Sequence, residues 1–203
     1  MDLSATPFFL ASSVGGYLLG SIPFGLVLTR MAGIDLRSIG SGNIGATNVL
    51  RSGRKDLALA TVLLDSLKAG LAALAFGFAF GPDAGFVAGT AAFVGHCYPV
   101  WLSFKGGKGV ATYAGLLLFT SLKAFTIAAP IWLGLFAISR ISSLAALSAA
   151  IVVPAGAYFL DERPFVVGGL VILSLLVFYT HRSNIARLLA GTEPRFGTKS
   201  GSL

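Results

Sequence analysis

Seven apolar stretches, separated by short polar segments, account for most of this chain. A helix needs roughly 20 apolar residues to cross the hydrocarbon layer of a bilayer. To within a few residues, the stretches cover 4–29, 56–80, 84–103, 109–122, 123–139, 143–160 and 165–181. The fourth is short, so residues 109–139 fit either two short helices or one re-entrant pair. The pattern predicts an all-α membrane protein with about seven transmembrane helices.

Positive charge is spread unevenly over the segments between these stretches. With the N-terminus outside, the outer segments carry only Lys123 and Arg163. The inner segments then hold Arg30, Arg37, Arg51, Arg54, Lys55, Lys105, Lys108, Arg140, Arg182, Arg187, Arg195 and Lys199. Because cytoplasmic loops carry the excess of lysine and arginine, we expect the N-terminus outside and the C-terminus in the cytoplasm.

Composition supports a membrane protein and excludes several other classes. Hydrophobic residues make up 55% of the chain and charged residues 11%, with a mean hydropathy of +0.84, whereas soluble domains carry about 25% charged residues. The apolar N-terminal run is too long for a signal-peptide core and is interpreted as a retained first span. The polar stretch 30–55 is too short for a soluble domain, so residues 1–203 are expected to form a single membrane domain.

The cysteines, histidines and glycines of the sequence limit which structural bonds, metal sites and helix contacts the chain can form. Cys97 is the single cysteine, so no disulfide or cysteine metal cluster is possible within the chain. No Cys, His and Asp residues stand at ligand spacing, and no metal is expected. Several glycines lie inside the apolar stretches, where they allow close helix packing. They include the pairs Gly16 and Gly20, and Gly85 and Gly89, together with Gly115.

The first polar patch, residues 40–51, reads GSGNIGATNVLR. Its glycine spacing matches a dinucleotide fingerprint, but that motif has meaning only between a strand and a helix. Bare glycine N–H groups beside a fixed guanidinium favour a phosphate site; a flexible loop is the alternative. The candidate ligands are Gly40, Ser41, Gly42, Asn43, Gly45, Thr47, Asn48 and Arg51.

The second patch, residues 105–109, reads KGGKG and fails the P-loop pattern in both its glycine spacing and its missing hydroxyl residue. Two lysines alone would serve as a positive-inside anchor. Adjacent glycines cost backbone entropy unless a close approach is needed, which favours a second phosphate or carboxylate contact. The candidate ligands are Lys105, Gly106, Gly107, Lys108 and Gly109.

Two groups of polar residues inside the apolar stretches are ambiguous. Asp65 and Lys68 stand three apart on one helix face, near the inner end of their stretch, as either a functional pair or a mutually neutralising structural pair. His96, at the lower end of the third stretch, is either an interface histidine or a base. The His-x4-Asp pair that soluble and peripheral glycerolipid acyltransferases use is absent, since Trp101 and Ala186 stand where the acid would be. No Gly-x-Ser-x-Gly elbow occurs either.

The third patch combines the start of the sixth stretch with the tail. Ser142 and Ser143 either cap a helix N-terminus or donate to a phosphate there. In the tail, Asn184 and Arg187 lie close to one face of a short helix that follows His181. Glu193 comes shortly after them. With the orientation above, all three patches lie on the cytoplasmic side.

Taken together, these segments resemble the bacterial acyl-phosphate:glycerol-3-phosphate acyltransferases. The matching motifs are GSGNIGATN with Arg51, then Gly95-His96-x-x-Pro99 with FKGGKGVAT at 104–112, then Ser142-Ser143, His181-Arg182-x-Asn184-x-x-Arg187 and Gly191-Thr192-Glu193. The resemblance runs from Gly20-Ser21-Ile22-Pro23 to the tail. No motif position departs from the family pattern.

The resemblance implies a seven-span enzyme of the bacterial inner membrane with a cytoplasmic active site. Such an enzyme transfers a fatty acyl group from acyl phosphate to the sn-1 hydroxyl of glycerol 3-phosphate, giving lysophosphatidic acid and inorganic phosphate. This reaction begins phospholipid synthesis. No cofactor, nucleic acid or obligate protein partner is expected; the partners are the two substrates and the bilayer.

Acyl phosphate is already activated, so we expect catalysis by positioning and electrostatics without a covalent intermediate. The expected catalytic residues are Ser41, Arg51, His96, Lys105, Ser142 and Asn184, and the expected binding residues are the remaining patch residues with Ser143, His181, Arg187 and Glu193. The proton acceptor is left open between a substrate phosphate, His96 and His181. A transporter for a phosphorylated metabolite is the alternative function.

Overall fold

The computed structural model describes residues 5–197, so Lys199, one of the inner cations above, lies outside the described residues. Two compact units divide the chain, Met1–Leu122 and Lys123–Leu203, each built on its own set of helices. In the described part every regular element is helical. The all-α class is therefore confirmed, whereas a single domain over residues 1–203 stays a prediction.

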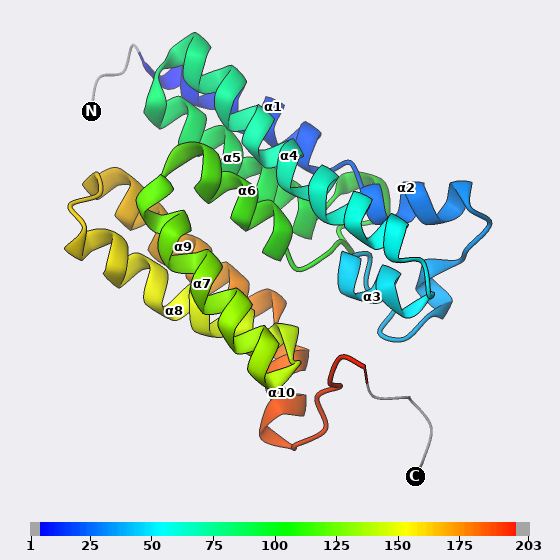
Figure 1. The fold of residues 1–203 in the computed structure, drawn as a ribbon. Coiled ribbons are helices and arrows are strands. Elements are labelled where there is room, and N and C mark those ends of the chain that lie inside the picture. Colours follow the sequence, from blue (N-terminus) through cyan, green and yellow to red (C-terminus); the bar gives the residue numbers. More distant parts are fainter. Residues whose placement is uncertain (1–4, 198–203) are drawn as a thin grey trace. The chain divides into compact units, whose positions relative to one another are not determined.

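Unit 1 is built from four packed helices and the loops at one of their ends (Figure 1). Helices α1, α4 and α5 contact one another, and α6 packs against α4 and α5. The elements in order are α1 (Thr6–Gly20), α2 (Phe24–Met31), η2 (Leu36–Ser38), α3 (Ala46–Arg51), α4 (Lys55–Phe80), α5 (Pro82–Cys97), η3 (Val100–Leu102) and α6 (Val110–Thr120). The first patch spans the loop into α3, and the second spans the loop between η3 and α6.

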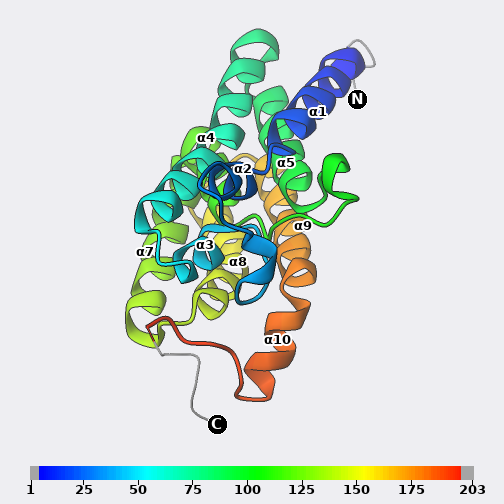
Figure 2. The ribbon, with the colours of Figure 1, turned by 90° about the vertical axis from the view of Figure 1, so that its right-hand side faces the viewer.

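Unit 2 contains three long helices and one short one. Its elements are α7 (Leu122–Ser139), α8 (Ser142–Phe159), α9 (Pro164–Thr180) and α10 (Arg182–Leu189). Helices α8 and α9 pack together, and α10 touches both. The chain bends by 62° where α9 passes into α10 (Figure 2).

Each predicted apolar stretch is helical over most of its length. Of the described helical segments, four are long and apolar enough to span a bilayer: Thr6–Met31, Lys55–Phe80, Leu122–Ser139 and Ser142–Phe159. The bent pair α9 and α10 gives a fifth. Helices α5 and α6 have only 16 and 11 residues. The count of seven spans and the orientation of the termini stay predictions.

Two predicted boundaries need correction. The stretch 4–29 is not one continuous helix, because α1 ends at Gly20 and α2 begins at Phe24; Pro23 has no N–H with which to continue the helical ladder. The stretch 84–103 is helical only to Cys97, since the residue before Pro99 is disfavoured from helical geometry. The region 109–139 forms two helices that meet at Ser121, which confirms the first of the two alternatives given for it.

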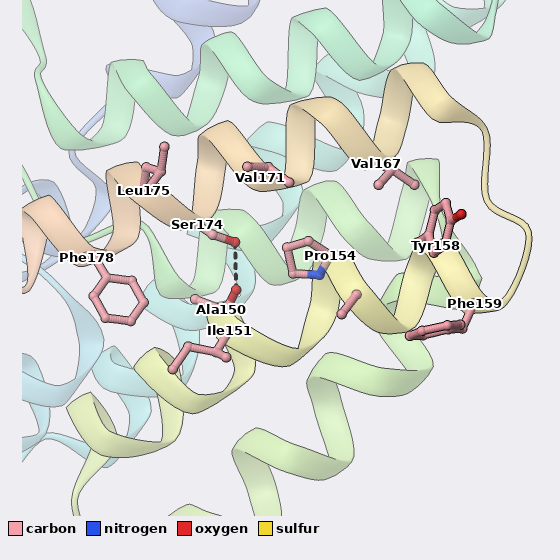
Figure 3. A pocket seen from close by; sticks show the side chains of 11 residues that line it. Ala150, Ile151, Pro154, Tyr158, Phe159, Val167, Val171, Ser174, Leu175 and Phe178 are labelled. Atoms are coloured by element: carbon pink, nitrogen blue, oxygen red, sulfur yellow. Dashed lines mark hydrogen bonds between the residues drawn. The ribbon is translucent and has the colours of Figure 1, made fainter.

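Proline lies inside two helices of unit 2, as the sequence pattern predicts. In α8, the Pro154 ring prevents the usual hydrogen bond to the carbonyl of Ala150, four residues earlier. Ser174 Oγ of α9 donates to that carbonyl at 2.7 Å (Figure 3). A neighbouring helix thus satisfies the freed group, which is how membrane helices tolerate internal proline. Pro130 likewise lies inside α7.

The face around Pro154 also carries an apolar groove between α8 and α9 (Figure 3). Its volume is about 530 Å³, and Ile151, Tyr158 and Phe178 are among the side chains lining it. Its surface is almost wholly apolar, and no residue of the three polar patches lines it. The candidate chemistry therefore lies elsewhere, in the loops.

Glycine allows α1 and α5 to pack closely in unit 1, as expected from the sequence. A Cβ added at Gly16 would collide with the backbone of Ala88, and one at Gly20 with the backbone of Ala92. Gly85, Gly89 and Gly115 are similarly close to neighbouring helices. Small residues are how membrane helices come this close together.

We expect Gly16→Ala to destabilise the protein by about 1–3 kcal/mol, the usual cost of adding a methyl group to a packed interior. The backbone of Ala88 cannot move aside without separating α1 from α5. Thermal unfolding of the purified protein in detergent measures the effect. Gly134→Ala is the matched control, because a Cβ there meets nothing within 4 Å. Equal shifts in the two variants would contradict the packing argument.

Candidate functional site

The first patch is a tight loop organised by its own side chains. Gly40 and Gly42 have φ values of 53° and 64°, a region that glycine enters without strain. Asn48 is buried; its Nδ2 donates to Leu36 O at 3.1 Å and its Oδ1 accepts from Ser41 N at 3.2 Å. The Asn48 side chain, one of the candidate ligands, thus stabilises the loop from inside through these hydrogen bonds. Its role toward a substrate stays a prediction.

Further contacts anchor the same loop from inside. Asn43 Oδ1 accepts a hydrogen bond from Gly45 N at 2.9 Å, just before α3 begins. Leu36, Ile44 and Val49 are fully buried in one apolar cluster under the loop. The loop is therefore a packed structure and not a flexible linker.

Arg51 is the last residue of α3, next to this loop. A Cβ at Gly40 would collide with the Arg51 side chain and with Asn48 Oδ1, so glycine is required there for space as well as for φ. Arg51 is exposed. Among the residues that the structure describes, no carboxylate forms an ion pair with it. Ser41 is exposed in the same loop, and Thr47 is exposed in the first turn of α3.

The second patch folds back onto the end of α5. Gly106 N donates to Cys97 O, and Gly107 N donates to His96 O, each at 3.0 Å. A Cβ on Gly106 would collide with backbone, and one on Gly107 with the His96 ring. Gly109 has a φ of 79° and lies against Phe93. The close approach predicted for these glycines is therefore an approach to α5.

Arg37 joins the two patches and was not among the predicted site residues. Its Nη1 donates to Gly42 O at 3.1 Å, and its Nη2 donates to Lys105 O at 2.7 Å. One guanidinium therefore ties together loops that are 68 residues apart in sequence. The sequence showed Arg37 only as one of many inner cations, and nothing in its local pattern marks the contact.

The lysines of the second patch differ in exposure. Lys105 is exposed, and Lys108 is half-buried. In the described part of the chain, the Lys105 side chain has no carboxylate partner. Arg37 thus brings an unpaired lysine and the glycine loop of the first patch into one assembly.

A buried polar cluster lies among α1, α4 and α5 of unit 1. Lys68 Nζ is 2.8 Å from Asp65 Oδ1, 2.9 Å from His96 Nδ1 and 2.9 Å from Ile22 O. The pairing of Asp65 with Lys68 is confirmed. Their predicted place near the helix end is wrong, because both lie near the middle of the 26-residue helix α4.

Unit 2 has its own polar cluster, centred on Glu193. Glu193 Oε1 accepts from Ser143 Oγ at 2.6 Å and from Asn184 Nδ2 at 2.5 Å, and Oε2 accepts from Arg187 Nε at 2.7 Å. Ser143 therefore does not cap α8 as one interpretation held; its hydroxyl is used by Glu193. Ser142 is the half-buried first residue of that helix.

The environment of Glu193 favours the ionised carboxylate. Burial by itself would raise the pKa of Glu193, but hydrogen bonds from Ser143, Asn184 and Arg187, with the charge of Arg187, outweigh it. The net effect is a pKa of Glu193 below its usual value. The arrangement neutralises Arg187, whereas Arg51 of unit 1 has no carboxylate partner among residues 5–197.

His181 occupies the junction of α9 and α10. It is buried, and its Nδ1 is 2.8 Å from Val177 O. Since a carbonyl only accepts, the Nδ1 atom carries the proton and donates. The histidine thus contributes to the bend between the two helices.

The unit 1 assembly is suited to holding an anion. Arg51, the last residue of α3, and Lys105, in the second patch, are exposed cations that have no carboxylate partner among the described residues. Guanidinium and ammonium groups of this kind bind phosphate through charge-assisted hydrogen bonds. The arrangement lacks a nucleophile paired with a base within the described residues of unit 1. It can orient and neutralise phosphate-bearing molecules.

Comparisons with known proteins agree with this chemistry. A family model described as "Glycerol-3-phosphate acyltransferase" matches residues 10–191. A protein of that name from Hyphomonas neptunium is 66% identical over 94% of each chain. Another from Maricaulis maris is 58% identical over 94% of this chain and 88% of its own.

A solved structure also matches. It is a crystal structure of PlsY, an integral membrane glycerol 3-phosphate acyltransferase, in its glycerol 3-phosphate form, with a TM-score of 0.88 and 41% identity over 94% of this chain and 96% of that chain. A lysophosphatidic acid form of PlsY matches with a TM-score of 0.86. The present chain is therefore an integral membrane protein that belongs to the glycerol-3-phosphate acyltransferase family.

Proposed function

We propose that this protein transfers a fatty acyl group from acyl phosphate to the sn-1 hydroxyl of glycerol 3-phosphate, at the cytoplasmic face of a bacterial inner membrane. The single observation that carries the proposal is that Arg51 and Lys105, two cations with no carboxylate partner in the described part of the chain, belong to patches joined by Arg37. Both substrates bear phosphate. Relatives named for glycerol 3-phosphate acylation, and PlsY structures in substrate and product forms, support it.

The reaction needs little covalent chemistry from the protein. The sn-1 oxygen of glycerol 3-phosphate attacks the acyl carbonyl carbon, the bond from that carbon to the phosphate oxygen breaks, and inorganic phosphate leaves. The hydroxyl proton ends on a phosphate. Ser41, Arg51, Lys105 and Lys108, with the patch glycines, would orient the phosphates and stabilise the charge that develops.

A substrate phosphate is the best-placed proton acceptor in this proposal. Its second pKa is roughly 6, so it can take a proton near neutral pH. The two histidines are less suited, because both side chains are buried and their Nδ1 atoms already contact Lys68 and Val177 O. For Ser142, Ser143, Asn184, Arg187 and Glu193 the substrate-contact roles remain predictions.

Phosphate release by the full-length protein in lipid tests the proposal. With palmitoyl phosphate and sn-glycerol 3-phosphate together, we expect inorganic phosphate and 1-acyl lysophosphatidic acid in equal amounts. Either substrate alone should give only background hydrolysis, and palmitoyl-CoA should not replace the acyl phosphate. Separation of the 1-acyl and 2-acyl products by chromatography checks the position of transfer.

The same protein sample also tests the alternative function, which is transport of a phosphorylated metabolite. Absence of turnover in folded protein, together with uptake of glycerol 3-phosphate into liposomes, would replace the enzyme with a transporter. The buried pair near the middle of α4 is the feature that a carrier would use. Its polar contacts, however, are to Ile22 O and His96 inside the protein, which argues against a transport path through it.

A further inference from the structure

The buried cluster of Asp65, Lys68 and His96 is not used in the reaction proposed above. Only 3% of the Asp65 and Lys68 side chains and 4% of His96 is exposed. The three residues come from α4 and α5, and the cluster also holds Ile22 at the break between α1 and α2. Burying a charge pair costs desolvation free energy unless good geometry and additional hydrogen bonds compensate for the lost hydration.

Lys68 has three polar neighbours in this cluster. Its Nζ is within hydrogen-bond distance of His96 Nδ1 and of Ile22 O, each at 2.9 Å, and forms an ion pair with Asp65 Oδ1 at 2.8 Å. The Ile22 carbonyl is one that the helix break leaves without a helical partner. Lys68 therefore fixes the break in the first span to the middle of α4.

The contact with Lys68 also assigns the tautomer of His96. Because an ammonium can only donate, His96 Nδ1 accepts, and the proton of the neutral ring is assigned to Nε2. The ring edge bearing Nε2 lies against Gly107. His96 is thus held between Lys68 on one side and the second patch on the other.

The second patch is bonded to the same part of α5. The His96 and Cys97 carbonyls accept the N–H groups of Gly107 and Gly106. The carbonyl of the adjacent Lys105 is in turn held by Arg37. A displacement of His96 would therefore move the loop that carries Lys105.

We propose that Lys68 is a positioning residue: through His96 it holds the loop 105–109 in the geometry that binds a substrate phosphate. His96 serves as the hydrogen-bond acceptor of Lys68 and not as the proton acceptor of the reaction. This inference rests on the acyl transfer proposed above, since it assigns the loop to one of the phosphates.

Two substitutions at His96 separate these roles. Asparagine places its Oδ1 close to the position of the histidine Nδ1, so His96→Asn keeps an acceptor for Lys68. His96→Leu removes it. We expect His96→Leu to lower kcat/KM at least 30-fold, mainly by raising KM for a phosphate substrate, and His96→Asn to retain at least tenfold more activity than His96→Leu. Equal, near-complete losses of kcat in both variants would overturn the proposal in favour of a histidine base.

Lys68 requires a double variant, because Lys68→Met alone leaves the Asp65 carboxylate buried without its partner. Replacing both residues, as D65N with K68M, nearly keeps the volume and removes both charges, so that no uncompensated buried charge is left. We expect a Tm close to that of the wild type with KM for a phosphate substrate raised at least tenfold. A wild-type Tm together with wild-type kinetic constants would show a purely structural pair and overturn the proposal.

Hydrogen–deuterium exchange provides a readout that does not depend on turnover. In the full-length protein in detergent, peptides covering Gly106 and Gly107 should exchange faster in His96→Leu and in the double variant than in the wild type. In His96→Asn they should exchange nearly as slowly as in the wild type. Unchanged exchange in all variants would overturn the positioning role. An inactive wild-type protein would instead refute the acyl transfer, and the exchange result would still decide the positioning.

Discussion

Replacing Arg51 with alanine is expected to lower kcat/KM for acyl transfer by about 100-fold or more. Removing a single preorganised donor from a developing negative charge typically costs 10²–10³ in rate. Arg51 is exposed at the end of α3, has no carboxylate partner among the described residues and lies against Gly40. Its removal takes the fixed positive charge from the first patch. Steady-state phosphate release at several concentrations of each substrate measures the loss.

Arg54 provides the matched control for Arg51. It lies three residues further on in the same loop, but its guanidinium is paired with Asp56 at 2.6 Å and both are exposed. Arg54→Ala should therefore change kcat/KM no more than about threefold, since exposed ion pairs contribute little. Arg51→Lys should fall between wild type and alanine, because lysine keeps the charge without the bidentate fork. Comparable losses in R51A and R54A would show a general effect of loop charge and contradict the assigned role.

The helices could be predicted from the sequence because their cause is local. Runs of apolar residues of bilayer-spanning length are helical whichever neighbours they meet, and the structure confirms helix in every predicted stretch. The boundary errors also have local causes. Pro23 interrupts the first stretch and Pro99 ends the third, because proline and the residue before it are disfavoured inside a helix.

The connections within the site could not be predicted, because they join distant segments. Lys68 meets the Ile22 carbonyl 46 residues earlier, and Arg37 meets the Lys105 carbonyl 68 residues later. Backbone carbonyls have no sequence signature, so no residue pattern announces such partners. The sequence therefore identified patches rich in phosphate-binding groups without showing which side chains hold the patches in place.

The contacts of Glu193 in the tail could not be predicted either. Glu193 was predicted as a substrate contact because of its place in the motif, yet its carboxylate already accepts three hydrogen bonds from Ser143, Asn184 and Arg187. A lone carboxylate beside cations in a phosphate-handling motif is itself a signal, because it would repel the substrate unless its charge were used internally. The structure shows this internal use.

Glu193→Ala is expected to lower acyl transfer about 100-fold or more, with a stability loss of about 1.5–3 kcal/mol, the typical value of a hydrogen bond to a charged group. Ser143, Asn184 and Arg187 would lose their shared acceptor at once. A shift of about 1 Å in positioned groups is enough for a 10²-fold loss of rate. Thermal unfolding and phosphate release measure the two effects. Unchanged stability with lost activity would instead indicate direct contact of Glu193 with substrate.

The stabilising effect of Glu193 should also depend on pH in a defined direction. Because the pKa of Glu193 is lower in the folded protein than in the unfolded chain, its ionised form favours folding. The contribution is complete above the unfolded value of about 4.3 and is lost as the pH falls through the folded pKa. The Tm difference between wild type and Glu193→Gln, which keeps the shape without the charge, should therefore be largest near pH 7 and shrink below about pH 4.3. A difference that stays constant from pH 7 to pH 3 would show that the carboxylate charge does not hold the cluster together.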